Sequence, residues 1–389
     1  MTAKPRIGLW FAGTSAIFFT RAFLFSTWVS RGPEVQDALG INTAQMGLLS
    51  MLYPAGGLAG ILFANALVHR YGSKFINAAT FVLVSVGFIV LGPAIENGNF
   101  FLASVCLFVM GLPMAISDYV GNLEASGVNA ASKRALFPAI HGLFGVGMLL
   151  GASAASYLID QKISLSTSFI GVAIFVGVVS VLAGFTFPKH VEPEISTEAK
   201  AQNRKLSIKV WGERRSLLLA VVGISFIIAE MSAGTWVPIA LTKNGFTGAE
   251  AASAFGVFWI VITFARLFGG YVVDFIGRFP TVLISTLTTA VGMFIFITTG
   301  LPYVGLVLWG LGMALGFPMV VSAMSDDAKL AAPRVNLIIT VVYIGSISVG
   351  PALGALGQAA GIYVAFAIPL AIMLIAASLS KITKPSTAK

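Results

Sequence analysis

Charged residues are scarce in this chain. Only 10% of its 389 residues are Asp, Glu, Lys or Arg, whereas 57% are hydrophobic. A soluble domain carries about a quarter charged residues, so a single soluble globule is excluded. Apolar runs of roughly twenty residues or more recur along the chain, and each is long enough to cross a hydrocarbon core of about 30 Å as a helix.

Cysteine and the common catalytic signatures are also scarce. Cys106 is the single cysteine, so it cannot form an internal disulfide, and its apolar surroundings predict a small buried residue. The sequence has no His or Cys cluster with metal-ligand spacing, no nucleotide-binding Gly-rich loop and no Gly-x-Ser-x-Gly elbow. We therefore expect no metal, no cofactor and no ATP hydrolysis. An enzyme acting on lipid would have a cluster of catalytic acids and bases at one membrane interface. The acidic residues of this chain instead lie apart, some at mid-depth and others in the polar stretch between the two halves.

Twelve transmembrane helices are predicted, with both termini on one side of the membrane. The helices are expected at 7–31, 44–68, 75–95, 100–131, 136–159, 166–187, 215–241, 250–273, 279–299, 303–325, 335–358 and 361–381. Nineteen basic residues fall on the side of the termini and only Arg31, Lys162 and Lys243 fall opposite. The positive-inside rule therefore predicts cytoplasmic termini in an inner membrane. Because topology accounts for the net charge of +9, no nucleic-acid partner is expected.

Short motifs of the first half return in the second half at a nearly constant offset. Gly72 returns 205 residues later as Gly277, and the two longer matches are Gly111-Leu112-Pro113-Met114 with Gly316-Phe317-Pro318-Met319 and Thr27-Trp28-Val29 with Thr235-Trp236-Val237. This repeat predicts an all-α membrane protein of two six-helix bundles, 1–187 and 215–389, joined by a cytoplasmic linker at 188–214. In such proteins a solute binds between the halves near the bilayer midplane.

Three ionisable residues, Arg21, Asp118 and Glu230, fall near the middle of predicted helices. Each costs at least about 2.5 kcal/mol to insert, so each is a candidate for a shared solute site. The simpler alternative is that Arg21 only neutralises one acid. The other acid would then be left to carry a proton, with Glu230 preferred over Asp118. Trp28 and Trp236 follow Arg21 and Glu230 at similar spacing, and they either line the solute site or anchor the outer interface.

The helix expected at 100–131 carries further polar residues. Asn122 lies one turn after Asp118 on the same face, so the two can together hydrogen-bond a sugar or polyol. Glu124 lies about 9 Å from Asp118 along the axis, and it is either a further proton carrier or the partner of a basic residue. His141, on the next helix, is either a proton relay or a packing group.

The stretch from Gly270 to Arg278 resembles the cytoplasmic Gly-x-x-x-Asp-(Arg)-x-Gly-Arg signature of the major facilitator superfamily, with Phe275 replacing the first basic residue. The corresponding stretch of the first half, from Asn65 to Lys74, keeps Arg70 but has His69 where the signature has its acid. The chain is more closely similar to the YbjJ-type bacterial inner-membrane branch, which is distantly related to fucose–proton symporters. That similarity rests on Thr27-Trp28-Val29-Ser30-Arg31, Asp118 with Asn122-Leu123-Glu124, His141-Gly142, Ala229-Glu230 with Trp236, and Gly316-Phe317-Pro318.

The resemblance implies a secondary transporter in which two six-helix bundles rock to alternate access. Helices one, four and seven would line the central cavity, and the proton gradient would supply the energy. A cytoplasmic gate is expected from four charged residues, namely Arg70, Arg266, Asp274 and Arg278. The solute is expected to be a sugar, a polyol or an organic anion.

Symport into the cell is preferred over proton-driven export of a drug or metabolite. The drug-antiporter signature of the superfamily belongs in the fifth helix, where Met148 instead follows Gly147. A non-transporting membrane sensor is the alternative from another class, but the linker and tails are too short for a soluble sensing domain. The expected partners are therefore a small-molecule solute and the lipid bilayer. The chain is expected to be a monomer and not an enzyme.

Overall fold

The computed structural model describes residues 6–132, 136–188, 206–327 and 329–385. These residues are almost entirely helical, and no strand occurs among them. Twelve helical segments in this part of the chain are long and apolar enough to cross a membrane. The predicted all-α membrane fold is confirmed, and so is the number of spans.

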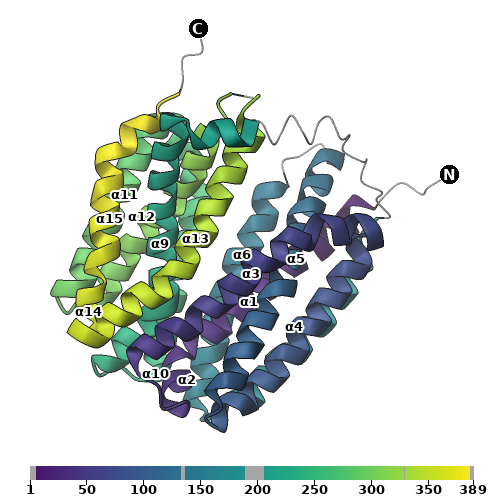
Figure 1. Ribbon diagram of the computed structural model, residues 1–389, viewed down its shortest axis with the longest axis vertical. Coiled ribbons are helices and arrows are strands. Elements are labelled where there is room, and N and C mark those ends of the chain that lie inside the picture. Colours follow the sequence, from purple (N-terminus) through teal and green to yellow (C-terminus); the bar gives the residue numbers. More distant parts are fainter. Residues whose placement is uncertain (1–5, 133–135, 189–205, 328, 386–389) are drawn as a thin grey trace. The chain divides into compact units, whose positions relative to one another are not determined.

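The first six spans, most of which are labelled in Figure 1, lie close to their predicted ranges. They are α1 (Ile7–Ser30), α3 (Thr43–Tyr71), α4 (Ser73–Glu96), α5 (Phe100–Ala131), α6 (Phe137–Asp160) and α7 (Leu165–Gly184), with the short α2 (Gly32–Ala38) following α1. Cys106 is buried in α5 and unbonded, as its apolar surroundings predict.

The later spans follow the same pattern, except for the last one. They are α9 (Arg214–Lys243), α10 (Gly248–Ile276), α11 (Arg278–Thr298), α12 (Pro302–Met324), α13 (Ala331–Ala360), α14 (Ile362–Ala365) and α15 (Ala367–Leu379), which η1 (Ser380–Thr383) ends. The helix predicted at 361–381 is interrupted at Phe366. Pro369 has no N–H to donate to the carbonyl of Ala365, so one helical hydrogen bond is missing across this break.

Glycines bring α6 against the stretch of α1 that carries Arg21. A Cβ atom on Gly147 would lie 2.3 Å from the carbonyl oxygen of Phe19, and one on Gly151 would lie 2.5 Å from that of Phe23. Any larger residue would therefore push the two helices apart. Because Arg21 lies between these two contact points on α1, its backbone is held close to α6.

Two compact units divide the chain, namely Met1–Glu192 with Gly234–Ile260, and Pro193–Ala233 with Val261–Lys389. The end of α9 and the start of α10 thus group with the first six spans. The bundles predicted at 1–187 and 215–389 stay a prediction. Residues 189–205 of the predicted linker lie outside the described residues, and so do residues 1–5 and 386–389 at the termini.

Candidate functional site

An ion pair between Arg21 of α1 and Asp118 of α5 forms the centre of the first candidate site. Both residues lie within three positions of the middle of their helices. The Arg21 Nη2 atom is 2.5 Å from Asp118 Oδ1, and Nη1 donates to the carbonyl of Ser117 at 3.4 Å. The side chain of Arg21 is 8% exposed and that of Asp118 is 47% exposed. The pair therefore presents its carboxylate, more than its guanidinium, to a solute.

Asn122 fixes the orientation of this carboxylate. Its Nδ2 atom donates to the backbone oxygen of Asp118 at 2.9 Å and to Oδ1 at 3.2 Å. The same Oδ1 atom therefore forms the ion pair with Arg21 and accepts the hydrogen bond from Asn122. A carboxylate held from two sides loses little rotational freedom when it binds a solute hydroxyl.

Two residues that no sequence pattern singled out hold Arg21 in place. The guanidinium lies over the ring of Phe18, 4.8 Å from its centroid. A Cβ atom on Gly121 would lie 3.2 Å from Arg21 Nη1 and 3.3 Å from Phe18. Phe18 resembles any apolar residue of a transmembrane helix, so only its position under the guanidinium reveals its role.

Glu124 of α5 and His141 of α6 each contact an aromatic residue of α1, the helix that carries Arg21. Glu124 is fully buried, and its Oε2 atom accepts a hydrogen bond from the indole nitrogen of Trp10 at 2.7 Å. His141 of α6 is exposed and meets Phe18 edge to face, with 4.6 Å between ring centroids. Phe18 therefore contacts both Arg21 and His141. The proton-carrying roles of Glu124 and His141 stay predictions.

A second candidate site pairs Glu230 of α9 with Arg266 of α10. Arg266 Nη2 lies 3.6 Å from Glu230 Oε2, and their side chains are 38% and 18% exposed. Arg266 Nε also donates to the carbonyl of Ala314 at 3.2 Å. The gate predicted from the sequence joins Arg266 with Asp274, whereas Arg266 pairs with Glu230. Arg266 and Asp274 are eight positions apart on α10, a rise of about 12 Å. Arg266 therefore pairs with the nearer acid, Glu230 of α9.

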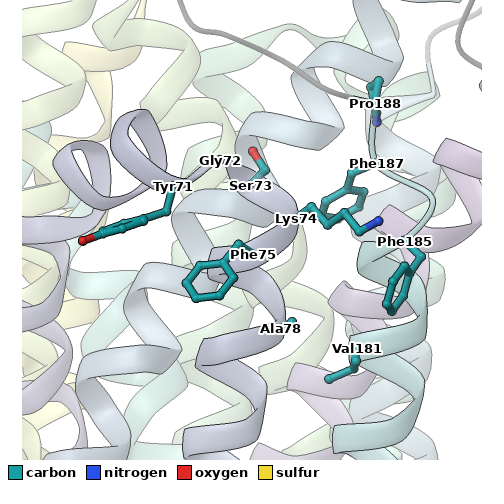
Figure 2. Close-up of a pocket in the computed structure, with 10 residues that line it drawn as sticks. All are labelled: Tyr71, Gly72, Ser73, Lys74, Phe75, Ala78, Val181, Phe185, Phe187 and Pro188. Carbon is teal, nitrogen blue, oxygen red and sulfur yellow. The ribbon is translucent and has the colours of Figure 1, made fainter. Parts of the chain in front are cut away.

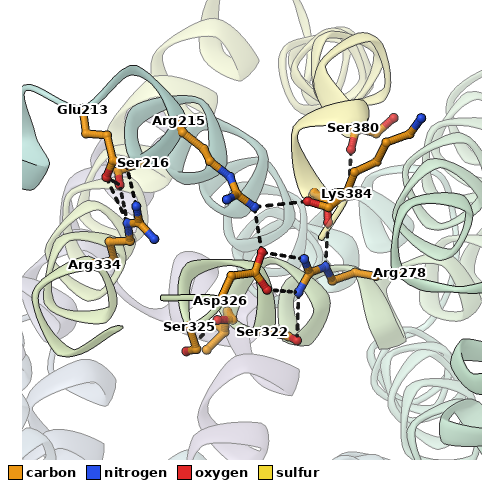
Figure 3. A network of polar contacts seen from close by, with 12 residues as sticks. Glu213, Arg215, Ser216, Arg278, Ser322, Ser325, Asp326, Arg334, Ser380 and Lys384 are labelled. Atoms are coloured by element: carbon orange, nitrogen blue, oxygen red, sulfur yellow. Dashed lines mark hydrogen bonds and ion pairs between the residues drawn. The ribbon is translucent and has the colours of Figure 1, made fainter. Parts of the chain in front are cut away.

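Arg278 and Asp326 centre a polar cluster at the ends of helices in the second unit (Figure 3). Arg278 binds Asp326 through two hydrogen bonds of 2.8 and 2.7 Å, and Arg215 adds a third at 2.7 Å. Arg278 Nε donates to the carbonyl of Thr383 at 2.6 Å. Asp274 is exposed, and no ion pair joins it to a residue in the described ranges. Arg278 thus has Asp326 as its acidic partner instead of Asp274.

The pair of Glu213 and Arg334 lies beside this cluster (Figure 3). Arg334 Nη2 donates to Glu213 Oε1 at 2.5 Å and Arg334 Nε donates to Oε2 at 2.9 Å. These hydrogen bonds hold the pKa of Glu213, which precedes α9, below its ordinary value, although burial acts in the opposite direction. In the sequence Arg334 is one of the nineteen basic residues on the side of the termini, and its partner depends on tertiary packing.

The remaining predicted residues lie apart from these pairs. Trp28 and Trp236 are buried, with exposed fractions of 9% and 0%. The ring centroid of Trp28 is 6.2 Å from that of Phe169, and no acceptor for the Trp236 indole occurs in the described part of the chain. Arg70 is exposed and its guanidinium lies 5.2 Å from the ring centroid of Tyr71. The solute-binding and gating roles of these residues stay predictions.

Twelve helical spans in the described ranges, four of which carry the two ion pairs Arg21–Asp118 and Glu230–Arg266, define a multi-pass membrane protein of the kind that moves solutes. The model of the Major Facilitator Superfamily matches residues 11–351, and the chain belongs to this family. An uncharacterized MFS-type transporter of Yersinia pestis is 24% identical over 381 residues, which cover 95% of each chain. A glucose/galactose transporter of Brucella abortus biovar 1 (strain 9-941) is 22% identical over 391 residues, which cover 95% of this chain and 92% of that one.

Solved structures of transporters share the fold. The nucleoside transporter NupG, in a mutant form, superposes with a TM-score of 0.78 at 13% identity, covering 96% of this chain and all of the other. The E. coli fucose:proton symporter FucP, also as a mutant, superposes with a TM-score of 0.64 at 16% identity, covering 96% of this chain and 98% of the other. The predicted resemblance to this superfamily is confirmed, and the relatives are transporters and not enzymes.

Proposed function

We propose that this transporter moves a small polar solute across the bacterial inner membrane by alternating access, in symport with protons. The observation that carries the proposal is the arrangement of Asp118, which is half exposed at mid-depth and held by Arg21 and Asn122. A carboxylate accepts hydrogen bonds from hydroxyl groups, and an amide both donates and accepts them. The site therefore suits a solute rich in hydroxyl groups.

A neutral solute fits this site better than an anion. The positive charge of Arg21 is already balanced by Asp118, and its guanidinium is also covered by the Phe18 ring and the Ser117 carbonyl. An anion would have to displace Asp118 and would then face a second negative charge. Relatives that are described as a glucose/galactose transporter and a fucose:proton symporter support a sugar-like solute. An organic anion is the alternative.

Proton coupling is assigned to Glu230. Protonation would cancel its attraction to Arg266 across 3.6 Å and so release a tie between α9 and α10. A change that favours one of two conformations shifts their populations, which is how a proton can drive reorientation of a bound solute. In this proposal the proton gradient is the only energy source, the chain works as a monomer without a cofactor, and the basic ends of the helices face the cytoplasm.

The test is uptake of sugars, polyols and nucleosides into proteoliposomes under an imposed pH gradient. Glu230→Gln is expected to abolish gradient-driven accumulation while leaving exchange of solute across the membrane intact, because the variant binds solute but cannot release a proton. Glu250→Gln, the same change at an exposed position on α10, is the matched control. Normal accumulation by Glu230→Gln would refute its role as the proton carrier. Solute leaving the vesicle against its gradient would instead indicate export.

A further inference from the structure

A pocket lies where the turn between α3 and α4 meets the end of α7 (Figure 2). Its volume is about 530 Å³, and aromatic residues of all three helix ends line it together with Lys74. The Lys74 ammonium lies 4.2 Å from the centroid of the Phe185 ring. This contact holds the cation at the pocket, between α4 and α7.

An apolar groove continues from this pocket along α4 and α7. Its volume is about 480 Å³, and Val181 lines both cavities. The groove is lined mainly by aliphatic side chains, among them Val82, Val86, Ile174 and Val178. Its one polar side chain, Ser85, donates to the carbonyl of Ala173 at 2.9 Å. The groove therefore offers a continuous hydrocarbon surface.

Among the described residues of the three helices that form the pocket, the charges nearest to it are positive. Arg70 and Lys74 flank it, and Arg70 lies over Tyr71, which lines the pocket. The sequence has no Asp or Glu from Asn42 to Ile95, nor from Ile163 to Pro188, so no acid on α3, on α4 before its last residue or on α7 competes for these cations. The α4 helix also begins at the pocket, with its positive dipole end at Ser73.

The dimensions match a membrane lipid. Lys74 and Ile89, which lie toward the two ends of the paired cavities, are fifteen residues apart on α4. This separation corresponds to a rise of about 22 Å for the pocket and the groove together. The groove alone runs from Ala173 to Leu182 of α7, a rise of about 14 Å, which is close to the half-thickness of about 15 Å of a bilayer's hydrocarbon core. An extended acyl chain can thus lie along the groove while its headgroup occupies the pocket.

We propose that these two cavities form a binding site for an anionic phospholipid, with its phosphate at Lys74 and one acyl chain in the groove between α4 and α7. Basic pockets between transmembrane helices are suited to anionic headgroups. The site is formed by residues other than Arg21, Asp118 and Asn122, so it does not depend on the identity of the solute.

The experiment is native mass spectrometry of the delipidated full-length chain titrated with dioleoyl phosphatidylglycerol or dioleoyl phosphatidylcholine. We expect the anionic lipid to bind more tightly. Lys74→Ala should weaken its binding about fivefold, the effect of one basic residue near a lipid surface, and should weaken phosphatidylcholine less, because the choline cation offsets the charge of its phosphate. Lys381→Ala, at an exposed lysine of the second unit, is the matched control.

The groove is tested separately by filling it. Val86 is 53% exposed, and Val86→Trp should weaken both lipids, whereas Val291→Trp on α11, at a site that is 50% exposed, should weaken neither. Size-exclusion profiles establish that the variants are folded, and Ile174→Trp replaces Val86→Trp if the latter aggregates. Equal affinity for the two lipids, or equal effects of Lys74→Ala and Lys381→Ala, would overturn the headgroup site. If glycerol phosphate, which lacks acyl chains, binds as strongly as the anionic phospholipid, the proposal that an acyl chain occupies the groove is wrong.

Discussion

Removing the acid from the Arg21–Asp118 pair should destabilise the protein more than removing both charges. Asp118→Asn leaves the buried cation of Arg21 without an ionic partner, whereas Arg21→Gln with Asp118→Asn leaves two neutral groups that can hydrogen-bond each other. Breaking a buried pair from one side is costly because a charge remains in a poorly solvated place. The double variant should therefore be more stable than Asp118→Asn alone.

The size of the coupling follows from the geometry of the pair. Coulomb's law across 2.5 Å gives about 7 kcal/mol at an effective dielectric constant of ~20 and about 2 kcal/mol in water. Asp118 is half exposed, so its surroundings lie nearer to the second limit. We expect a coupling energy of about 2 to 3 kcal/mol between the two substitutions in a double-mutant cycle.

The assay is unfolding of the purified protein in mixed micelles by titration with sodium dodecyl sulfate. The two single variants and the double variant complete the cycle, and Asp274→Asn, at an exposed acid on α10, measures the effect of the same substitution without a buried partner. A coupling energy close to zero would refute the argument that the pair is energetically linked. A double variant less stable than Asp118→Asn would refute the argument that the unpaired cation is the larger cost.

Two further predictions concern the polar cluster of the second unit and the Glu213–Arg334 pair beside it. Asp326→Asn should lower the free energy of unfolding by about 3 kcal/mol, because Arg278 and Arg215 are left facing each other, and adding Arg278→Gln should recover part of this loss; the same detergent titration measures both, and an unchanged unfolding midpoint contradicts the prediction. Because the pKa of Glu213 is lower in the folded protein than its ordinary value of 4.5, the ionised carboxylate stabilises the folded state fully above pH 4.5. This stabilisation is lost as the pH falls from 4.5 through the lower pKa of the folded state. The melting temperature of the wild-type protein should therefore fall more steeply below about pH 4.5 than that of Glu213→Gln, and parallel curves would contradict this.

The sequence was sufficient to predict the number of helices because the length and apolarity of a span are local properties. The mid-depth charges could be identified for a related reason, since a residue such as Arg21 is costly in lipid wherever its partner lies. The partners could not be assigned in the same way. Arg266 binds Glu230 because of how α9 and α10 are rotated against each other, and the sequence does not encode that rotation in any short pattern.

The role of Phe18 is hidden from the sequence for a different physical reason. Its ring has the composition of ordinary packing, and only the guanidinium above it and His141 at its edge give it a further role. The break between α14 and α15 could not be placed from Pro369 alone, because Pro54, Pro113 and Pro351 lie inside helices that run on unbroken. The polar cluster around Asp326 could not be predicted either, because its members come from four separate stretches of the chain.

The burial of Cys106 makes this chain convenient for spectroscopy. A thiol-reactive dye needs an accessible thiol, and the one native thiol is buried in α5. Cysteines introduced at solvent-facing helix ends should therefore label selectively, without first replacing any native residue. Pairs of dyes placed in this way would report the rocking of the protein directly, as a change in fluorescence energy transfer when solute and protons are added.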